Sequence, residues 1–241
     1  MDEKQKIIDQ LKEGLIVSCQ ATPDEPHYME GITTMMARCA FWAGAVAIRA
    51  NTPNDVKSIA GAVPLPVIGL WKIGRGEKKV YLTPTIEAAK ALYATGAKII
   101  AAQATSHIRD DGKPAYEIIR EIKREIPEAL IFADVSNAED AKIAAKYGAD
   151  FIAPTLYGYG NNPKDILETT HNYGPDWELL SSIIKAVKGT DSLVIMEGKI
   201  NTPEQAVQCL YMGAYAVVVG NAITRPHMAA SRFVDAINRY E

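Results

Sequence analysis

The sequence predicts a (β/α)8 TIM barrel, with residues 1–241 forming a single domain. Short apolar runs alternate with segments of helical periodicity, which is the pattern of βα units around a parallel sheet. Eight such runs occur, and 241 residues is within the usual size of one barrel. The last two runs end in polar turns that contain glycine, and in these barrels the corresponding turns commonly bind phosphate.

The predicted strands are short and continuously apolar, as in Val217-Val218-Val219. This character favours strands that are buried on both faces over a sheet with one face in water. In chain order, the expected strands are residues 14–20, 45–50, 66–72, 97–103, 130–135, 150–155, 192–197 and 214–220.

The segments between these strands carry residues that start and stop helices. Thr202 and Pro203 supply an N-cap and a first-turn proline, and Gly213 closes that helix. Asn137 and Gly148 repeat the arrangement. A first helix at residues 3–12 is expected to close the bottom of the barrel. The other expected helices are residues 28–43, 54–62, 85–95, 115–125, 138–147, 176–188, 203–212 and 228–239.

One irregular segment is longer than an ordinary βα loop. Residues 156–175 follow the sixth expected strand and are rich in Gly, Asn, Tyr and Pro. Long loops at this end of a barrel often close over a substrate, so we expect an active-site lid.

Charge and composition exclude several classes of partner. The net charge of −3 gives no general attraction to nucleic acid or to an anionic membrane. The charged N-terminus lacks a signal-peptide apolar region, and no apolar run approaches a membrane span, so a cytoplasmic protein is expected. The three cysteines and four histidines lack the spacing of a metal site, and no metal is expected.

Polar residues end most of the expected strands. Active sites of TIM barrels lie at the carboxyl ends of the strands, and an unpaired charge at a buried position is costly. Any single charged residue there can simply mark where a strand meets water. Four charged residues, Arg49, Lys72, Asp134 and Glu197, are expected to converge on one barrel mouth, and this favours an active site. These strand-end residues are Gln20, Arg49, Lys72, Gln103, Asp134, Thr155, Glu197 and Asn221.

Lys72 and Glu197 are the candidate catalytic residues. Lys72 follows an apolar strand, so loss of solvent and the neighbouring Arg49 are expected to lower its pKa from about 10.4. A lysine of this kind serves as a general base or as a Schiff-base nucleophile. A carboxylate facing it suits proton abstraction next to a carbonyl, although ordinary ion pairing explains the same two residues.

The turns after the last two strands are the candidate phosphate site. Glycine allows backbone amides to approach an anion, and a helix N-terminus adds partial positive charge. These turns are residues 197–204 and 220–226.

Taken with their neighbours, these residues resemble the N-acetylmannosamine-6-phosphate 2-epimerases. The likeness runs from the first expected strand to the last expected helix. It is carried by GLIVSCQA at 14–21, AIRAN at 47–51, PVIGLWK at 66–72, ADVS at 133–136, EGKINTPEQA at 197–206, GAYAVVVG at 213–220 and AITRP at 222–226.

The resemblance implies an enzyme of sialic acid catabolism that needs no cofactor. Its substrates would be N-acetylmannosamine 6-phosphate and N-acetylglucosamine 6-phosphate. By the same resemblance, Lys72 moves the C2 proton and Glu197 is its carboxylate partner. Contacts to the phosphate are implied for Gly198, Lys199, Gly220, Asn221 and Arg225. Contacts to the sugar are implied for Gln20, Arg49 and Asp134.

The chain departs from the family pattern at the barrel mouth. Gln103 stands where the family usually has Asp, and Tyr157 and Gly160 stand where it usually has Ser and Thr. Ile73 and Lys199 each replace a usual arginine. Such changes alter which polar groups of a substrate find hydrogen-bond partners. The sequence therefore leaves open whether the substrate carries an N-acetyl group.

Two other functions are compatible with the same residues. A Schiff base on Lys72 would give an aldolase-like lyase that acts on a phosphosugar. The altered positions Gln103 and Tyr157 also allow a phosphosugar-binding protein without catalysis. In the epimerase, either one residue both removes and returns the C2 proton, or a second residue returns it. A homodimer is expected only from its general frequency.

Overall fold

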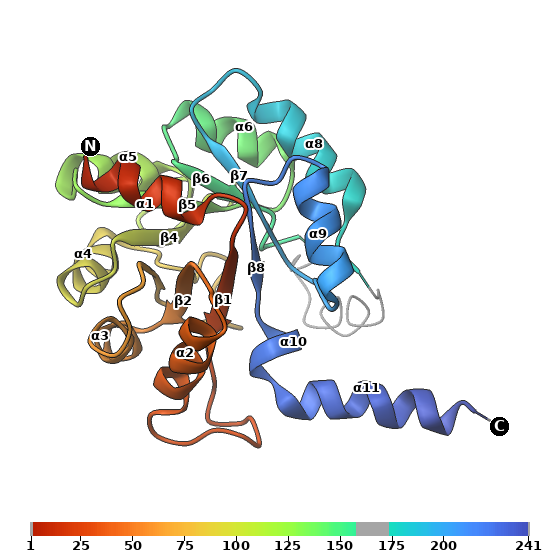
Figure 1. Ribbon diagram of the computed structural model, residues 1–241. Coiled ribbons are helices and arrows are strands. Elements are labelled where there is room, and N and C mark those ends of the chain that lie inside the picture. The colour runs from red at the N-terminus through yellow and green to blue at the C-terminus, as the bar shows by residue number, and fades with distance from the viewer. Residues whose placement is uncertain (1, 158–173, 241) are drawn as a thin grey trace.

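The computed structural model describes residues 2–157 and 174–240 and forms a closed barrel of eight parallel strands (Figure 1). The strands follow one another in chain order, and β8 pairs with β1 to close the sheet. This confirms the predicted (β/α)8 architecture. The strands are β1 Leu15–Cys19, β2 Ala47–Asn51, β3 Val67–Leu70, β4 Ile99–Gln103, β5 Leu130–Asp134, β6 Phe151–Ala153, β7 Leu193–Glu197 and β8 Ala216–Val219.

Helices surround the sheet, and α6 and α9 begin at the predicted caps Asn137 and Thr202. The Thr202 hydroxyl accepts a hydrogen bond from the Gln205 amide at 3.3 Å, and Asn137 accepts one from Asp140 at 2.9 Å. The helices are α1 Glu3–Leu11, α2 Ile32–Trp42, α3 Pro53–Ala60, α4 Ile86–Ala94, α5 Glu117–Glu125, α6 Ala138–Lys146, α8 Trp177–Val187, α9 Pro203–Tyr211, α10 Asn221–Thr224 and α11 Pro226–Asn238.

The inside of the barrel is filled by alternate residues of the strands, because side chains of a strand point to opposite faces in turn. Leu11 of α1 is fully buried in the same cluster, and the Tyr215 hydroxyl bonds the carbonyl of Ile8 at 2.8 Å. Helix α1 therefore closes the base of the barrel, as predicted. The other buried members are Ile16, Ala47, Ile68, Leu70, Leu82, Ile99, Ala101, Leu130, Phe132, Phe151, Ala153, Ile195, Ala216 and Val218.

Strand β3 ends two residues before the predicted limit. Lys72 instead forms an antiparallel bridge with Leu82, and the Ile73 amide bonds the carbonyl of Tyr81 at 2.8 Å. Residues 71–83 thus fold back on themselves, and this segment is called the ribbon below. Leu82, near the end of the ribbon, enters the barrel interior.

Two predicted segments differ at their starts. Helix α2 begins four residues later than expected, because Gly31 before it has a φ of +77° and interrupts the helical backbone. The last predicted helix, residues 228–239, corresponds to α11, which begins two residues earlier at Pro226, and α10 is an additional short helix before it. A short extra helix after β8 is a usual feature of phosphate-binding barrels.

Helix α11 projects away from the barrel (Figure 1). None of its residues is buried. Phe233, Val234 and Ile237 are 73%, 54% and 70% exposed, and Tyr240 follows at 92%. An amphipathic helix is expected to bury such a stripe, so α11 lacks a partner within the described part of its own chain.

Most of the predicted lid, residues 156–175, lies outside the described residues. Among the helices that the structure describes, none has both the length and the apolar character that a membrane crossing requires.

Candidate active site

The inner residues of each strand change from apolar to polar toward its carboxyl end. Every second residue of a strand points into the barrel. The next inward-facing residue after Ala47 is therefore Arg49, after Phe132 it is Asp134, and after Ile195 it is Glu197. These carboxyl ends form one rim, which is called the mouth below. The alternation thus brings the predicted charged residues together above an apolar interior.

Arg49 lies at the centre of a buried ionic network. Its Nη2 donates to both carboxylate oxygens of Asp134, at 2.8 and 2.7 Å, and its Nη1 pairs with Glu197. Arg49 is 1% exposed and Asp134 is fully buried. Burial raises the pKa of Asp134, and the paired guanidinium opposes that rise. Two carboxylates therefore share one cation, which fixes all three side chains in place.

Lys72 reaches the same mouth from the ribbon. Its Nζ donates to Oε1 of Gln20 at 2.6 Å, and its backbone amide donates to Asn51 at 3.0 Å. Burial lowers the pKa of Lys72 to about 7, and the positive charges of Arg75, Arg49 and Arg225 add to this effect. A substantial fraction of Lys72 is therefore neutral near pH 7 and able to accept a proton.

Lys72 and Glu197 have separate partners. Glu197 is held by Arg49 and by the Thr155 hydroxyl, whose oxygen lies 3.3 Å from its carboxylate. No salt bridge joins Lys72 to Glu197 among the residues that the structure describes. Ordinary pairing with each other thus does not account for these two residues.

The turn after β7 leaves room for a ligand. Gly198 has a φ of +110°, and a side chain placed there would meet nothing within 4 Å. Lys199 follows with a φ of +57°, and its Nζ lies 5.8 Å from the centre of the Tyr157 ring. Within the described ranges Lys199 has no carboxylate partner, so its charge is available to an anion.

The turn after β8 places Arg225 at the end of α10. Gly220 precedes this helix, and a Cβ there would come within 3.3 Å of Ser18. Arg225 pairs with Glu25 and donates to Asn221. The predicted phosphate residue thus already has an acidic partner.

Several neighbours of the site were missed by sequence reasoning. Asn51 lies two residues after Arg49, so the alternation of inner positions could have identified it. Glu25 and Arg75 lie in irregular segments and gave no such signal. Glu25 also lies with His27 and His227 in a group whose donor atoms are within 4.8 Å of one another.

The departures at the mouth have different structural meanings. Gln103 is 3% exposed, and its amide donates to the carbonyl of Lys79 at 2.9 Å and to Thr105 at 3.1 Å. Its oxygen accepts the Tyr81 amide at 3.2 Å. Gln103 therefore holds the ribbon. Gly160 lies outside the described residues.

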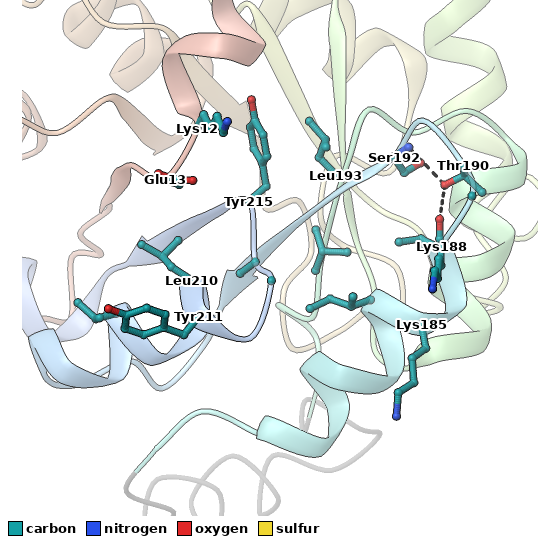
Figure 2. Close-up of a pocket in the computed structure, with 17 residues that line it drawn as sticks. Lys12, Glu13, Lys185, Lys188, Thr190, Ser192, Leu193, Leu210, Tyr211 and Tyr215 are labelled. Carbon is teal, nitrogen blue, oxygen red and sulfur yellow. Dashed lines mark hydrogen bonds between the residues drawn. The ribbon is translucent and has the colours of Figure 1, made fainter.

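A groove of about 1020 Å³ lies at the opposite end of the barrel, between α8, α9 and the turn after α1 (Figure 2). Lys185 and Lys188 of α8 and Tyr211 of α9 line it. None of the predicted site residues contributes to this groove. This end of a TIM barrel usually serves stability rather than catalysis.

Comparison with known proteins gives consistent matches over nearly the whole chain. Residues 33–239 match the family model NanE, described as "Putative N-acetylmannosamine-6-phosphate epimerase". A protein of Latilactobacillus sakei called "Putative N-acetylmannosamine-6-phosphate 2-epimerase" is 40% identical over 98% of this chain and 99% of its own length. A protein of the same description from Listeria welshimeri is 40% identical over 96% of this chain and 95% of its own.

Solved structures agree with this result. The N-acetylmannosamine-6-phosphate 2-epimerase of Clostridium perfringens is 38% identical and covers 95% of this chain and 96% of its own, with a TM-score of 0.84. An aldolase named QR15, 22% identical over 97% of this chain and 99% of its own, has a TM-score of 0.62 and shows the barrel fold alone.

Proposed function

Because this chain belongs to the NanE family, we propose that its barrel mouth interconverts N-acetylmannosamine 6-phosphate and N-acetylglucosamine 6-phosphate. The observation that carries the mechanism is a lysine with a pKa of about 7 that shares one mouth with a fixed carboxylate. Such a lysine suits reversible transfer of a carbon-bound proton.

The reaction proceeds through the open-chain aldehyde. Neutral Lys72 takes the proton from C2, and the electrons of the C–H bond form a C1–C2 double bond while C1 oxygen becomes negative. Return of a proton to the opposite face of C2 gives the other epimer and restores the C1 carbonyl. Gln20 accepts a hydrogen bond from Lys72 and so orients its Nζ.

Arg49 supports this step by holding two acidic groups. Its guanidinium fixes Glu197 on one side and Asp134 on the other. We propose that Glu197 is the second group: in its protonated form it either returns a proton to C2 or donates a hydrogen bond to the enolate oxygen. When it gives its proton to C2, solvent restores that proton and takes the one that Lys72 removed. Gln20, Arg49 and Asp134 stay the predicted sugar contacts. Asp134 is fully buried and binds Arg49 through both oxygens, so it holds the guanidinium in place at the mouth.

The phosphate is assigned to the turns after β7 and β8. Lys199 has no acidic partner within the described ranges, and open space lies before Gly198. Gly220, Asn221 and Arg225 supply the second half of this site. Binding energy from the remote phosphate holds C2 against Lys72, which raises the rate of the chemical step.

Exchange of the C2 proton in D₂O tests the proposal. Wild-type enzyme should place deuterium at C2 of both epimers, and Lys72→Ala should not. If Glu197 returns the proton, Glu197→Gln should still exchange C2 of one epimer but form little of the other. If Glu197 only stabilises the enolate, exchange and epimerisation should fall together. Turnover without deuterium at C2 would contradict the proposal.

Borohydride trapping separates this function from an aldolase-like lyase. A substrate-dependent adduct on Lys72 would support the lyase, because a Schiff base is reduced to a stable amine. We expect no adduct. Comparison of N-acetylated with plain hexose 6-phosphates then defines the substrate, and absence of any turnover would favour a phosphosugar-binding protein.

A homodimer and a cytoplasmic location remain predictions. The structure supports the homodimer through α11, which exposes Phe233, Val234 and Ile237. An isolated helix of 13 residues is marginal in water, so we propose that a second copy of this chain covers it. Light scattering should give a dimer for wild type and for Asp235→Ser, and a monomer for the variant Phe233→Glu with Ile237→Glu.

A further inference from the structure

We propose that Glu25, His27 and His227 bind a divalent transition-metal ion such as Zn²⁺, Ni²⁺ or Co²⁺. Glu25 and His27 lie in the segment between β1 and α2, and His227 lies in the first turn of α11. Their donor atoms are within 4.8 Å of one another, and all three side chains are half-buried. Two chain segments that are far apart in sequence thus meet at one group of metal-binding side chains.

Three of the four imidazole nitrogens lack a hydrogen-bond partner among the described residues. Both ring nitrogens of His27 and Nδ1 of His227 are buried without a hydrogen bond to any described residue. The two rings lie side by side, with centroids 5.0 Å apart and planes inclined by 31°. A buried polar atom without a partner costs about 1–3 kcal/mol, so each is normally satisfied. A metal ion between the rings would satisfy one nitrogen of each.

The donor set selects the class of metal. Imidazole nitrogen suits zinc, copper and nickel, and a carboxylate oxygen completes a common three-residue set. Bonds of about 2.0–2.2 Å in a tetrahedral site place neighbouring donors roughly 3.4 Å apart. The donor atoms of Glu25, His27 and His227 would therefore have to approach one another by about 1.4 Å at most from their present separation of up to 4.8 Å. Small side-chain rotations suffice for this. A fourth position stays open to water.

The ion pair between Glu25 and Arg225 bears directly on this site. Oε1 of Glu25 pairs with Nε of Arg225, which leaves this oxygen the freer one for a metal. Oε2 accepts the Thr22 amide at 2.8 Å, the Thr22 hydroxyl at 3.2 Å and Nη2 of Arg225 at 3.5 Å. Each carboxylate oxygen can accept more than one bond, so Glu25 can hold a metal and Arg225 together. The nearby guanidinium charge weakens metal binding, and we therefore expect moderate rather than very tight affinity.

Metal titration of untagged, chelator-treated protein tests the proposal. Calorimetry with Zn²⁺ and Ni²⁺, and the visible absorption of added Co²⁺, should show one ion per chain. His27→Ala and His227→Ala should each weaken binding at least about tenfold, because each removes a ligand. Metal should also raise the melting temperature of wild type, since it joins the segment before α2 to α11.

Matched variants distinguish this site from the rest of the surface. His107→Ala removes a histidine that contacts Thr105, and Cys39→Ser removes an exposed thiol on α2. Both should bind metal as wild type does. His27→Gln and His227→Gln retain polar groups of similar size, so they preserve the test if the alanine variants fold poorly. Wild type without saturable binding, or undiminished binding in both histidine variants, would overturn the proposal.

Discussion

The two ends of the barrel use the same eight strands for opposite purposes. At the base, the inner positions are apolar and Leu11 closes the space with no exposed surface. At the mouth, the next inner positions carry Arg49, Asp134 and Glu197, which are bound to one another. Buried charges are costly to desolvate, and replacing such a group by apolar side chains is often stabilising. Their presence at one end only indicates that this end was selected for chemistry.

The groove at the base sharpens this contrast (Figure 2). Its polar groups complete the ends of helices and strands: Thr190 donates to the carbonyl of Val187 at 2.7 Å, and Ser192 donates to that of Ala149 at 2.6 Å. At the mouth, polar side chains from separate strands bind one another. A hollow in the surface is therefore a weaker guide to the active site than convergence of side chains.

Replacing Lys72 should have the largest effect on activity. Lys72→Ala removes the proposed base and should lower kcat by about 10²–10⁴-fold. Folding should be preserved, because the change also removes a poorly solvated ammonium group. Steady-state kinetics checks this, with Lys12→Ala at the base groove as the control. Activity within about tenfold of wild type would remove Lys72 from the mechanism.

Breaking the ionic network should lower the stability of the fold as well as the activity. Arg49→Met leaves Asp134 buried without its cation, and the free energy of unfolding should fall by about 3–5 kcal/mol. Urea denaturation measures this loss. The double variant Arg49→Met with Asp134→Asn should recover part of it, because the isolated charge is gone. Equal stability of wild type and Arg49→Met would show that the network is not buried as described.

Truncating Leu11 at the base should lower stability but leave kcat nearly unchanged. Leu11→Ala leaves a cavity under the barrel and should cost about 2–5 kcal/mol of unfolding free energy. The kcat of the folded enzyme should stay within about twofold of wild type, because the base does not meet substrate. A larger fall in kcat, measured well below the melting temperature, would contradict the division between the two ends.

The rate should also depend on pH. Lys72 has a lowered pKa of about 7, so it is protonated below this value and neutral above it. The kcat/KM, which reflects the free enzyme, should therefore rise about tenfold per pH unit up to about pH 7 and then level. Kinetics at substrate concentrations well below KM over this range tests the sign and the midpoint. A rate that falls as pH rises toward 7 would indicate that a protonated group is required.

The architecture and most of the mouth could be predicted because both follow local rules. Alternating apolar runs and caps such as Thr202 and Asn137 identify the βα units. The rule that active sites lie at strand ends then identifies Arg49 and Glu197 without any structure. Once the strands are known, their period of two residues decides which side chains point inward.

Contacts between distant segments could not be predicted in this way. Glu25 pairs with Arg225 across 200 positions, and nothing in either local pattern indicates the other. The ribbon was missed because its return depends on hydrogen bonds between Ile73 and Tyr81 rather than on periodicity. The apolar stripe of α11 predicts a helix with one face that needs burial. The same pattern does not identify which surface covers that face.

The bonds of Gln103 have a consequence for protein engineering. Both halves of its amide are engaged by the ribbon and Thr105, and a carboxylate at this position has no hydrogen to offer the Lys79 carbonyl. Chimeras that import residues 71–83 from a relative should therefore transplant the side chain at position 103 together with them. If only residues 71–83 or only position 103 were exchanged, the hydrogen bonds between them would be mismatched. The segment and the side chain should therefore be treated as one unit in the design of altered specificity.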